Sequence, residues 1–228
     1  SLIMTLKLNG TNSVAAPAYA GDDADTGLQC GTNELKLVTG GTARATVDSS
    51  GRLLVGASSA STLRTNIVPK IQTEATVATE NGISLFTNVN SSSGPFLIFG
   101  KSRGTTAGSN TVVQNNDDLA TLLFIGADGT DRASSGASIA AAVDGTPGSN
   151  DMPGRLVFST TADGASSPTE RLRITSDGTI RLASGCPGID FSQIQTNASG
   201  MSSETLDSYE EGTWTPTSGT NFGTFTGA

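Results

Sequence analysis

Histidine is absent from the 228-residue sequence, and tryptophan occurs only once. The lack of histidine excludes Ser-His-Asp and Cys-His nucleophilic sites and every imidazole metal ligand. Aromatic residues make up 5% of the chain, which leaves few rings for stacking against sugar rings. An enzyme of this composition would have to rely on carboxylates.

Basic residues are also scarce, since 13 Lys and Arg stand against 21 Asp and Glu and the net charge is −8. Nucleic-acid and anionic-membrane binding need clustered basic side chains, so neither is expected. The longest apolar run, residues 119–127, is far shorter than the roughly 20 residues that span a bilayer. No membrane insertion is therefore expected. Cys30 and Cys186 lack metal-ligand or redox spacing, and we expect two thiols in a reducing compartment.

Charged residues make up only 15% of the chain, against about 25% in typical globular domains, and 28 residues are glycine. Large apolar side chains are few and scattered. Little apolar surface is therefore available per residue to offset the entropy lost when the chain is ordered. A self-contained globule of this length is not expected.

Two similar stretches stand near opposite ends of the chain: ARATVDSSGRLLV (43–55) and ERLRITSDGTIRL (170–182). Each stretch is typical of a strand, a tight turn and a second strand. A two-residue loop would mix apolar and charged side chains on both faces, so we expect a three-residue loop that ends in a left-handed glycine. The expected pairs are Leu172–Leu182, Ile174–Ile180 and Arg173–Arg181 around Gly178, and Ala45–Val55, Val47–Leu53 and Asp48–Arg52 around Gly51.

Five short apolar runs, bounded by Gly, Pro, Asn or Asp, fill positions 83–168 and indicate an all-β meander. Alanine favours helix, but the run ASIAAAV (137–143) is short and is followed by a DGTPG turn, so a strand is expected. The continuous run ATLLFI (120–125) is typical of a strand covered on both faces. The five runs are GISLFTNV, GPFLIFGKSRG, LATLLFIGADGT, ASIAAAVDGTPG and GRLVFSTTADG.

Composition divides the chain into five expected parts. The stretch KIQTEATVAT near the end of the third part is read either as a short helix or as an extended connector. The parts are an amino-terminal arm (1–33), a first hairpin repeat (34–56), a linker (57–82), a central β-rich domain that ends in the second hairpin (83–185), and a connector with the start of a truncated carboxyl-terminal module (186–228).

Each hairpin would have one apolar and one polar face, and it is too small to be stable alone. Few other large residues are available to cover the apolar face, so the expected cover is an identical chain. Three copies around an axis would also close the edges of the sheets. These patterns do not by themselves distinguish three copies from two.

Three stretches resemble the structural parts of bacteriophage tail fibres: residues 21–56, residues 126–180, and ETLDSYEEGTWTPT at 204–217. Such fibres carry similar ER-R-I-x-S-x-G hairpins in series, and YEEGTWTP resembles the opening of a module towards their carboxyl end. The resemblance implies an all-β, elongated homotrimeric fibre of short-stranded hairpin repeats, with its chains intertwined or side by side. It also implies a virion protein that is assembled in the bacterial host cytoplasm.

The role implied by this resemblance is structural: a trimeric shaft that supports attachment to a host receptor. The implied partners are two further copies, other tail or virion proteins docked at the amino-terminal arm, and host surface polysaccharide or protein held by a distal segment. In such fibres the EEGTWTP module runs on, whereas this chain stops at FGTFTGA. The receptor-binding segment is therefore expected to be missing or contributed by another protein. Residues SLI precede Met4, where a start would look natural.

Two alternatives stay open, a tailspike-like polysaccharide depolymerase and a bacterial surface adhesin. A depolymerase needs two carboxylates that work together. Neighbouring residues on a strand point to opposite faces, so adjacent acids are expected to be solvated turn residues. The candidates are Asp117 with Asp118, Glu210 with Glu211, and the cluster Asp22, Asp23 and Asp25.

The aspartate cluster fits no known calcium-loop spacing, and the sequence leaves open whether it binds an ion. Three arginines of the second hairpin are expected to pair with acids of another chain, such as Glu170 or Asp177, rather than with a ligand. These arginines are Arg171, Arg173 and Arg181. No catalytic residue, cofactor or metal site is expected.

Overall fold

The computed structural model of the chain describes residues 7–8, 13, 19–20, 22–64, 67–190 and 205–206. Within these residues all regular structure is β except one 3₁₀ turn, Ala78–Glu80, so the all-β prediction is confirmed. The strands are β1 (Lys7–Leu8), β2 (Tyr19–Ala20), β3 (Gly27–Gly31), β4 (Glu34–Thr39), β5 (Thr42–Val47), β6 (Leu53–Val55), β7 (Ile71–Thr73), β8 (Asp118–Gly126), β9 (Ser134–Val143), β10 (Gly154–Thr160), β11 (Thr169–Ile174), β12 (Ile180–Leu182), β13 (Ile189–Asp190) and β14 (Thr205–Leu206).

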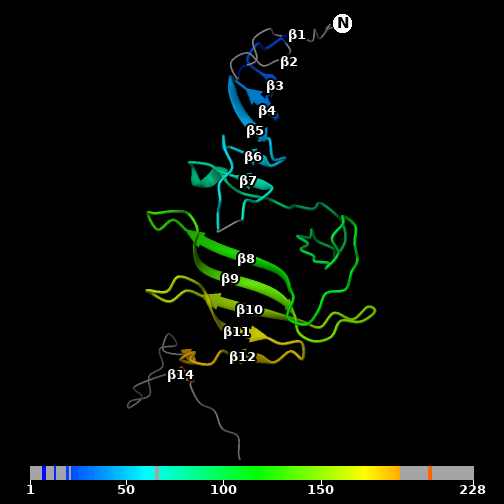
Figure 1. Cartoon of the computed structure of the whole chain (residues 1–228), viewed down its shortest axis with the longest axis vertical. Coiled ribbons are helices and arrows are strands. Elements are labelled where there is room, and N and C mark those ends of the chain that lie inside the picture. The colour runs from blue at the N-terminus through cyan, green and yellow to red at the C-terminus, as the bar shows by residue number, and fades with distance from the viewer. Residues whose placement is uncertain are drawn as a thin grey trace, which may run out of the picture.

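The strands pair in chain order. The first sheet runs from β1 to β7 and the second from β8 to β12, while β13 and β14 form a separate pair. Neighbouring strands are antiparallel except β6 and β7, which are parallel. Short connections favour this arrangement because each strand pairs with the one before it. Figure 1 shows the strands following one another down the long axis, so the molecule is elongated as expected.

The first hairpin has the predicted register. Val47 faces Leu53 across the strand pair, and Gly51 at the end of the loop has a φ of 68°. The Asp48 carboxylate accepts hydrogen bonds from the Arg52 backbone N–H at 3.0 Å and from Arg52 Nε at 2.6 Å. The expected Asp48–Arg52 pair is therefore present, and it closes the loop from the polar face.

The second hairpin repeats this geometry. Ile174 faces Ile180, Leu172 faces Leu182 and Arg173 faces Arg181, as the three-residue loop predicts. Gly178 has a φ of 85°, and its N–H donates to the Thr175 carbonyl oxygen at 2.9 Å. One turn type therefore serves both copies.

The prediction for the middle of the chain is correct in its second half and wrong in its first. The runs that begin at 119, 137 and 154 form β8, β9 and β10, and the alanine-rich run is a strand. The runs at 82–89 and 94–104 were expected to be strands, yet the structure has no strand there. A strand needs a partner edge for its backbone groups, and neither run pairs with one in the described part of the chain.

Four strands of the first sheet lie outside the segment expected for it, and β1 and β2 are two of them, both within the expected arm. β3 falls within the expected arm and pairs with β4, and β7 falls within the expected linker and pairs with β6. The stretch KIQTEATVAT is neither a short helix nor a plain connector, because it holds β7 and the 3₁₀ turn. The expected arm and linker are thus partly strands of this sheet. Most of the expected carboxyl-terminal module lies outside the described residues.

The chain buries few apolar side chains. Among the described residues, 28 large apolar side chains are exposed, and the largest fully buried ones are Leu54, Val38 and Val143. Because apolar burial is the main favourable term in folding, a single chain gains little from it. The buried apolar residues are Ala20, Val38, Leu54, Val113, Ala142 and Val143.

The left-handed glycine of the second hairpin yields a test of the turn. We expect Gly178→Ala to lower the free energy of unfolding by about 1–2 kcal/mol, because a Cβ is strained at positive φ. No atom lies within 4 Å of that Cβ position, so the loss would come from backbone strain alone. Gly178→Asn should lose less, because asparagine tolerates this conformation. Urea unfolding at one fixed chain concentration measures both changes.

The matched control is Gly82→Ala. Gly82 also has open space at the Cβ position, but its φ is not positive. This variant should unfold like the unchanged protein. Equal losses for Gly178→Ala and Gly82→Ala would contradict the assigned turn.

Candidate functional site

The most extensive feature of the first sheet is an apolar face that its own chain leaves uncovered. Alternation along the strands and the pairing register bring its apolar residues to one side. Leu37 is 52% exposed and Ile71 is 65% exposed, although large aliphatic side chains are usually buried. The two cross-strand rows of this face are Leu28, Leu37, Ala45 and Val55, and Cys30, Leu35, Val47, Leu53 and Ile71.

The opposite face of this sheet is closed by the chain itself. Thr46, Leu54 and Gln72 form a cross-strand row, and all three are buried. Gln72 Oε1 accepts a hydrogen bond from the Ser61 N–H at 2.8 Å, and Gln72 Nε2 donates to the Pro69 carbonyl oxygen at 3.1 Å. The chain thus buries a mixed polar row and exposes its leucine and valine rows, the reverse of the usual distribution.

The second sheet has an apolar face of the same kind. Its two rows cross all five strands without interruption, and the residues of each row face one another in register. Leu122 is 45% exposed and Ile180 is 68% exposed. The rows are Leu122, Ile139, Phe158, Leu172 and Leu182, and Ala120, Ala141, Leu156, Ile174 and Ile180.

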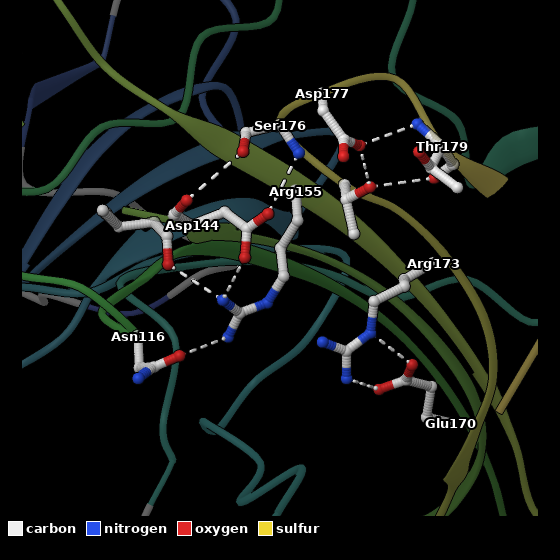
Figure 2. A network of polar contacts seen from close by, with 10 residues as sticks. Asn116, Asp144, Arg155, Glu170, Arg173, Ser176, Asp177 and Thr179 are labelled. Carbon is white, nitrogen blue, oxygen red and sulfur yellow. Dashed lines mark hydrogen bonds and ion pairs between the residues drawn. The ribbon is translucent and has the colours of Figure 1, made fainter. Parts of the chain in front are cut away.

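Arginine and glutamate side chains occupy the opposite face of the second sheet. Arg173 Nε and Nη2 each donate to a Glu170 carboxylate oxygen at 2.6 Å, in the bidentate geometry seen in Figure 2. Arg173 lowers the pKa of Glu170 below its ordinary value. Arg181 lies 3.8 Å from Asp177, and Arg171 Nε donates to Thr160 Oγ1 at 2.8 Å.

Two of these arginines therefore pair, within the chain, with the acids that were expected from another chain, and pairing between chains stays a prediction. Glu170 is three residues from Arg173, and Asp177 is four residues from Arg181. Acids so near in sequence lie within reach of the arginines of their own hairpin, so no second chain is required.

Asp144 connects the loop of the second hairpin to the turn after β9. Its Oδ2 accepts a hydrogen bond from the Ser176 backbone N–H at 3.0 Å, and its Oδ1 accepts from Arg155 Nη1 at 3.0 Å. Arg155 Nη2 also donates to Asn116 Oδ1 at 3.0 Å (Figure 2). The Ser176 N–H, followed by Arg155, lowers the pKa of Asp144 below its ordinary value. This network fixes the hairpin loop against the body of the sheet.

Two other carboxylates stabilise turns as ionised acceptors. Asp177 Oδ1 accepts from Thr175 Oγ1 at 2.5 Å and from the Thr179 N–H at 3.0 Å, and these bonds lower the pKa of Asp177 to about 2. The backbone N–H groups of Asp131 and Thr130 lower the pKa of Asp128 to about 2 in the same way. Both groups are charged at neutral pH and act as turn caps.

Of the adjacent pair Asp117 and Asp118, Asp117 is held in an ion pair with an arginine. Asp117 is buried and accepts hydrogen bonds from Arg103 Nε at 2.7 Å and from Nη2 at 2.6 Å. Arg103, with the Gln114 N–H, holds the pKa of Asp117 well below its usual range. A carboxylate held in this way is a poor proton donor at neutral pH. Glu210 and Glu211 lie outside the described residues.

The aspartate cluster near the amino terminus does not converge on a common point. Hydrogen bonding with Asp23 raises the pKa of Asp25 above its ordinary value, while Thr26 and then Asp25 lower the pKa of Asp23. In the described part of the chain, no group of three or more acidic or cysteine residues is placed to hold a metal ion.

Among the described residues, no helix has the length and apolar character needed to cross a membrane.

The polar contacts that organise the second sheet were not found by sequence reasoning. Arg103 and Asp117 are 14 residues apart, and Asp144 and Ser176 are 32 residues apart. No spacing in the sequence predicts that the residues of either pair are in contact. The charged residues within turns, such as Asp177, do have such a signal, because an aspartate before glycine is typical of a turn.

No protein-family model and no curated protein matches the chain. Among the solved structures that are similar to it in fold are two of a phage tail fibre. One is the carboxy-terminal domain of the bacteriophage T5 L-shaped tail fibre, with a TM-score of 0.51, 17% identity, and 88% of this chain and 79% of that chain covered. The other is the same domain with its intra-molecular chaperone domain, with a TM-score of 0.51, 16% identity, and 90% and 55% covered. The resemblance to tail fibres is confirmed at the level of the fold.

The capped turns make stability depend on acid pH. The folded-state pKa of Asp177 is about 2, below the ordinary value of 3.8, so its stabilising effect is complete above about pH 4 and is lost as pH falls towards 2. We expect Asp177→Asn to lower the melting temperature at pH 6 and to have no effect near pH 2. Thermal unfolding followed by circular dichroism across this range measures the difference.

Asp163→Asn is the control, because the Asp163 side chain is exposed and forms no hydrogen bond or ion pair with the described residues. Its melting temperature should match that of the unchanged protein at every pH. If Asp177→Asn gives the same flat difference, the assigned cap is wrong.

Proposed function

We propose that the chain is a non-enzymatic structural segment of a phage tail fibre, in which three copies form a stiff shaft that supports attachment to the host. The observation that carries this proposal is that both sheets present complete apolar faces that one chain leaves exposed. Such faces are characteristic of interaction surfaces. A protein that functions as a monomer would normally bury apolar faces of this size.

The number of copies, three, comes from the resemblance to tail fibres, and threefold symmetry is compatible with the exposed faces. Three copies around an axis bring three apolar faces together and give every face the same environment. The long axis of each chain then becomes the long axis of the assembly, because the strands follow one another along it (Figure 1). The fold likeness to a tail-fibre domain supports this arrangement.

The polar contacts fit a spacer that has to keep its shape. The Asp144–Ser176 contact fixes the hairpin loop against its sheet, and the bidentate Arg173–Glu170 pair lies within β11. In this proposal the shaft belongs to the virion and is assembled in the bacterial cytoplasm. Its other partners are tail proteins at the amino-terminal end and host polysaccharide or protein at a distal segment.

The carboxylates of the described residues support a role without catalysis. Asp117 is bound to Arg103, and Asp177 and Asp128 cap turns. Glycoside hydrolysis needs one carboxyl group with a raised pKa beside a second, ionised one. The Asp23–Asp25 pair has that order of pKa values, but it lies on a turn, with Asp23 exposed and Asp25 half-buried.

Location in the virion is the direct test of this function. The chain should be found by mass spectrometry in purified phage particles, and particles made without it should adsorb to host cells at least tenfold less. Normal adsorption of such particles would contradict the proposal. Presence on the bacterial surface instead would indicate the adhesin, and sugar release from host polysaccharide would indicate the depolymerase.

One pair of neighbouring substitutions separates an assembly surface from an ordinary exposed surface. Leu122 and Thr121 are both exposed on β8, and they point to opposite faces of the sheet. We expect Leu122→Asp to convert most of the trimer to smaller species, because it places a charge within the joined apolar faces. Thr121→Asp should leave the trimer intact.

Sedimentation velocity at micromolar concentration measures the effect of both substitutions. For a chain that is stable alone, both would change surface residues and have little effect on stability. Equal, small effects of Leu122→Asp and Thr121→Asp would therefore contradict the proposed interface.

A further inference from the structure

Residues 81–100 make no pairing contact in the structure of one chain. They contain no strand, and no backbone–backbone hydrogen bond joins them to another described segment. Their apolar side chains are turned to solvent: Phe86 is 81% exposed, Phe96 77% and Ile98 82%. Figure 1 shows this part of the chain within a long loop at the side of the second sheet.

The end of this stretch, residues 96–99, has the composition of a buried strand. No charged residue occurs between Glu80 and Lys101, and the run Phe96, Leu97, Ile98, Phe99 is continuously apolar. Such a run suits a strand that is covered on both faces. Pro95 stands immediately before it, a position where the missing N–H is tolerated at the start of a strand.

The second sheet has a free edge at β8, and this edge is uncharged like the segment described above. β8 pairs only with β9, so the backbone groups along its other side have no strand partner among the described residues. Residues 119–126 of β8 are also uncharged. Long apolar edges of this kind are normally protected by charges, by proline or by a cover, because they pair readily with other strands. Here the described part of the chain provides no such protection.

We propose that residues 95–100 of one copy add as a strand to the free edge of β8 in a second copy. This inference rests on the proposed function, which supplies the second copy. The addition satisfies the backbone groups of both segments at once. It also connects each chain to the next around the axis, so the chains of the shaft intertwine rather than lie side by side.

The anchor of the segment supports an occupant from another chain. Arg103 is fixed to Asp117 at the start of β8, and the Arg103 N–H donates to the Thr111 carbonyl oxygen at 3.2 Å. With its base held there, the segment lies off the edge of its own β8 in this structure and leaves that edge free. Its two phenylalanines, Phe96 and Phe99, are 77% and 52% exposed, which is on the order of 250 Å². That is about a third of the roughly 800 Å² per partner that a stable interface buries.

Photo-crosslinking tests this contact directly. We would place p-benzoylphenylalanine at position 96 in the full chain, a replacement that keeps the aromatic ring of Phe96. After irradiation, the denatured product should run at two or three times the chain mass. Mass spectrometry should map the crosslink to residues 118–126 of the other copy. A parallel protein with the same replacement at Phe158 provides the control, because Phe158 lies within the apolar face of the second sheet.

Several outcomes would overturn the inference. A crosslink from position 96 to β8 of the same chain leaves the product at single-chain mass, and a multi-chain product that maps outside 118–126 places the segment elsewhere. No product from position 96, with multi-chain product from position 158, would also overturn it. In the last two cases the trimer stands and only the strand addition fails. A chain that is monomeric before irradiation would instead contradict the proposed function itself, because that function requires three copies.

Discussion

The structure depends on one constraint: an apolar sheet face is stable in water only when something covers it. Each of the two large sheets has such a face, built from uninterrupted cross-strand rows, and the described part of the chain covers neither. The face that the chain does close in the first sheet carries Thr46 and Gln72 beside Leu54. An ordinary domain buries its apolar surface within itself, whereas here, on our proposal, other copies of the chain bury it.

The polar contacts have a complementary role, since they fix the shape of each chain before any partner arrives. Asp48 and Asp177 close the loops of the two hairpins, and Asp144 ties the second loop to the turn after β9. Their carboxylates are ionised acceptors, so they resist deformation at neutral pH without burying a charge. A sheet held in this way can present its apolar rows in register to identical rows of a neighbour.

The predictable features of the fold are those that local chemistry determines. The three-residue loops, the pairing of Ile174 with Ile180 and the strand at 137–143 all follow from turn residues and alternation within a few positions. The absence of strands at 82–104 could not be found from the same patterns, because a strand also requires a partner edge and these runs pair with none in the described residues. β3 and β7 were missed since they are short and polar and owe their pairing to neighbouring strands. The Arg103–Asp117 pair depends on a long-range approach that spacing does not encode.

The number of chains in the folded particle tests the central claim most directly. Light scattering on the intact chain, at two concentrations tenfold apart, gives that number, with circular dichroism to show that the protein is folded. Covered apolar faces predict three times the 23.0 kDa chain mass at both concentrations. A folded particle of single-chain mass would contradict the claim, because its exposed rows would then be stable without a partner.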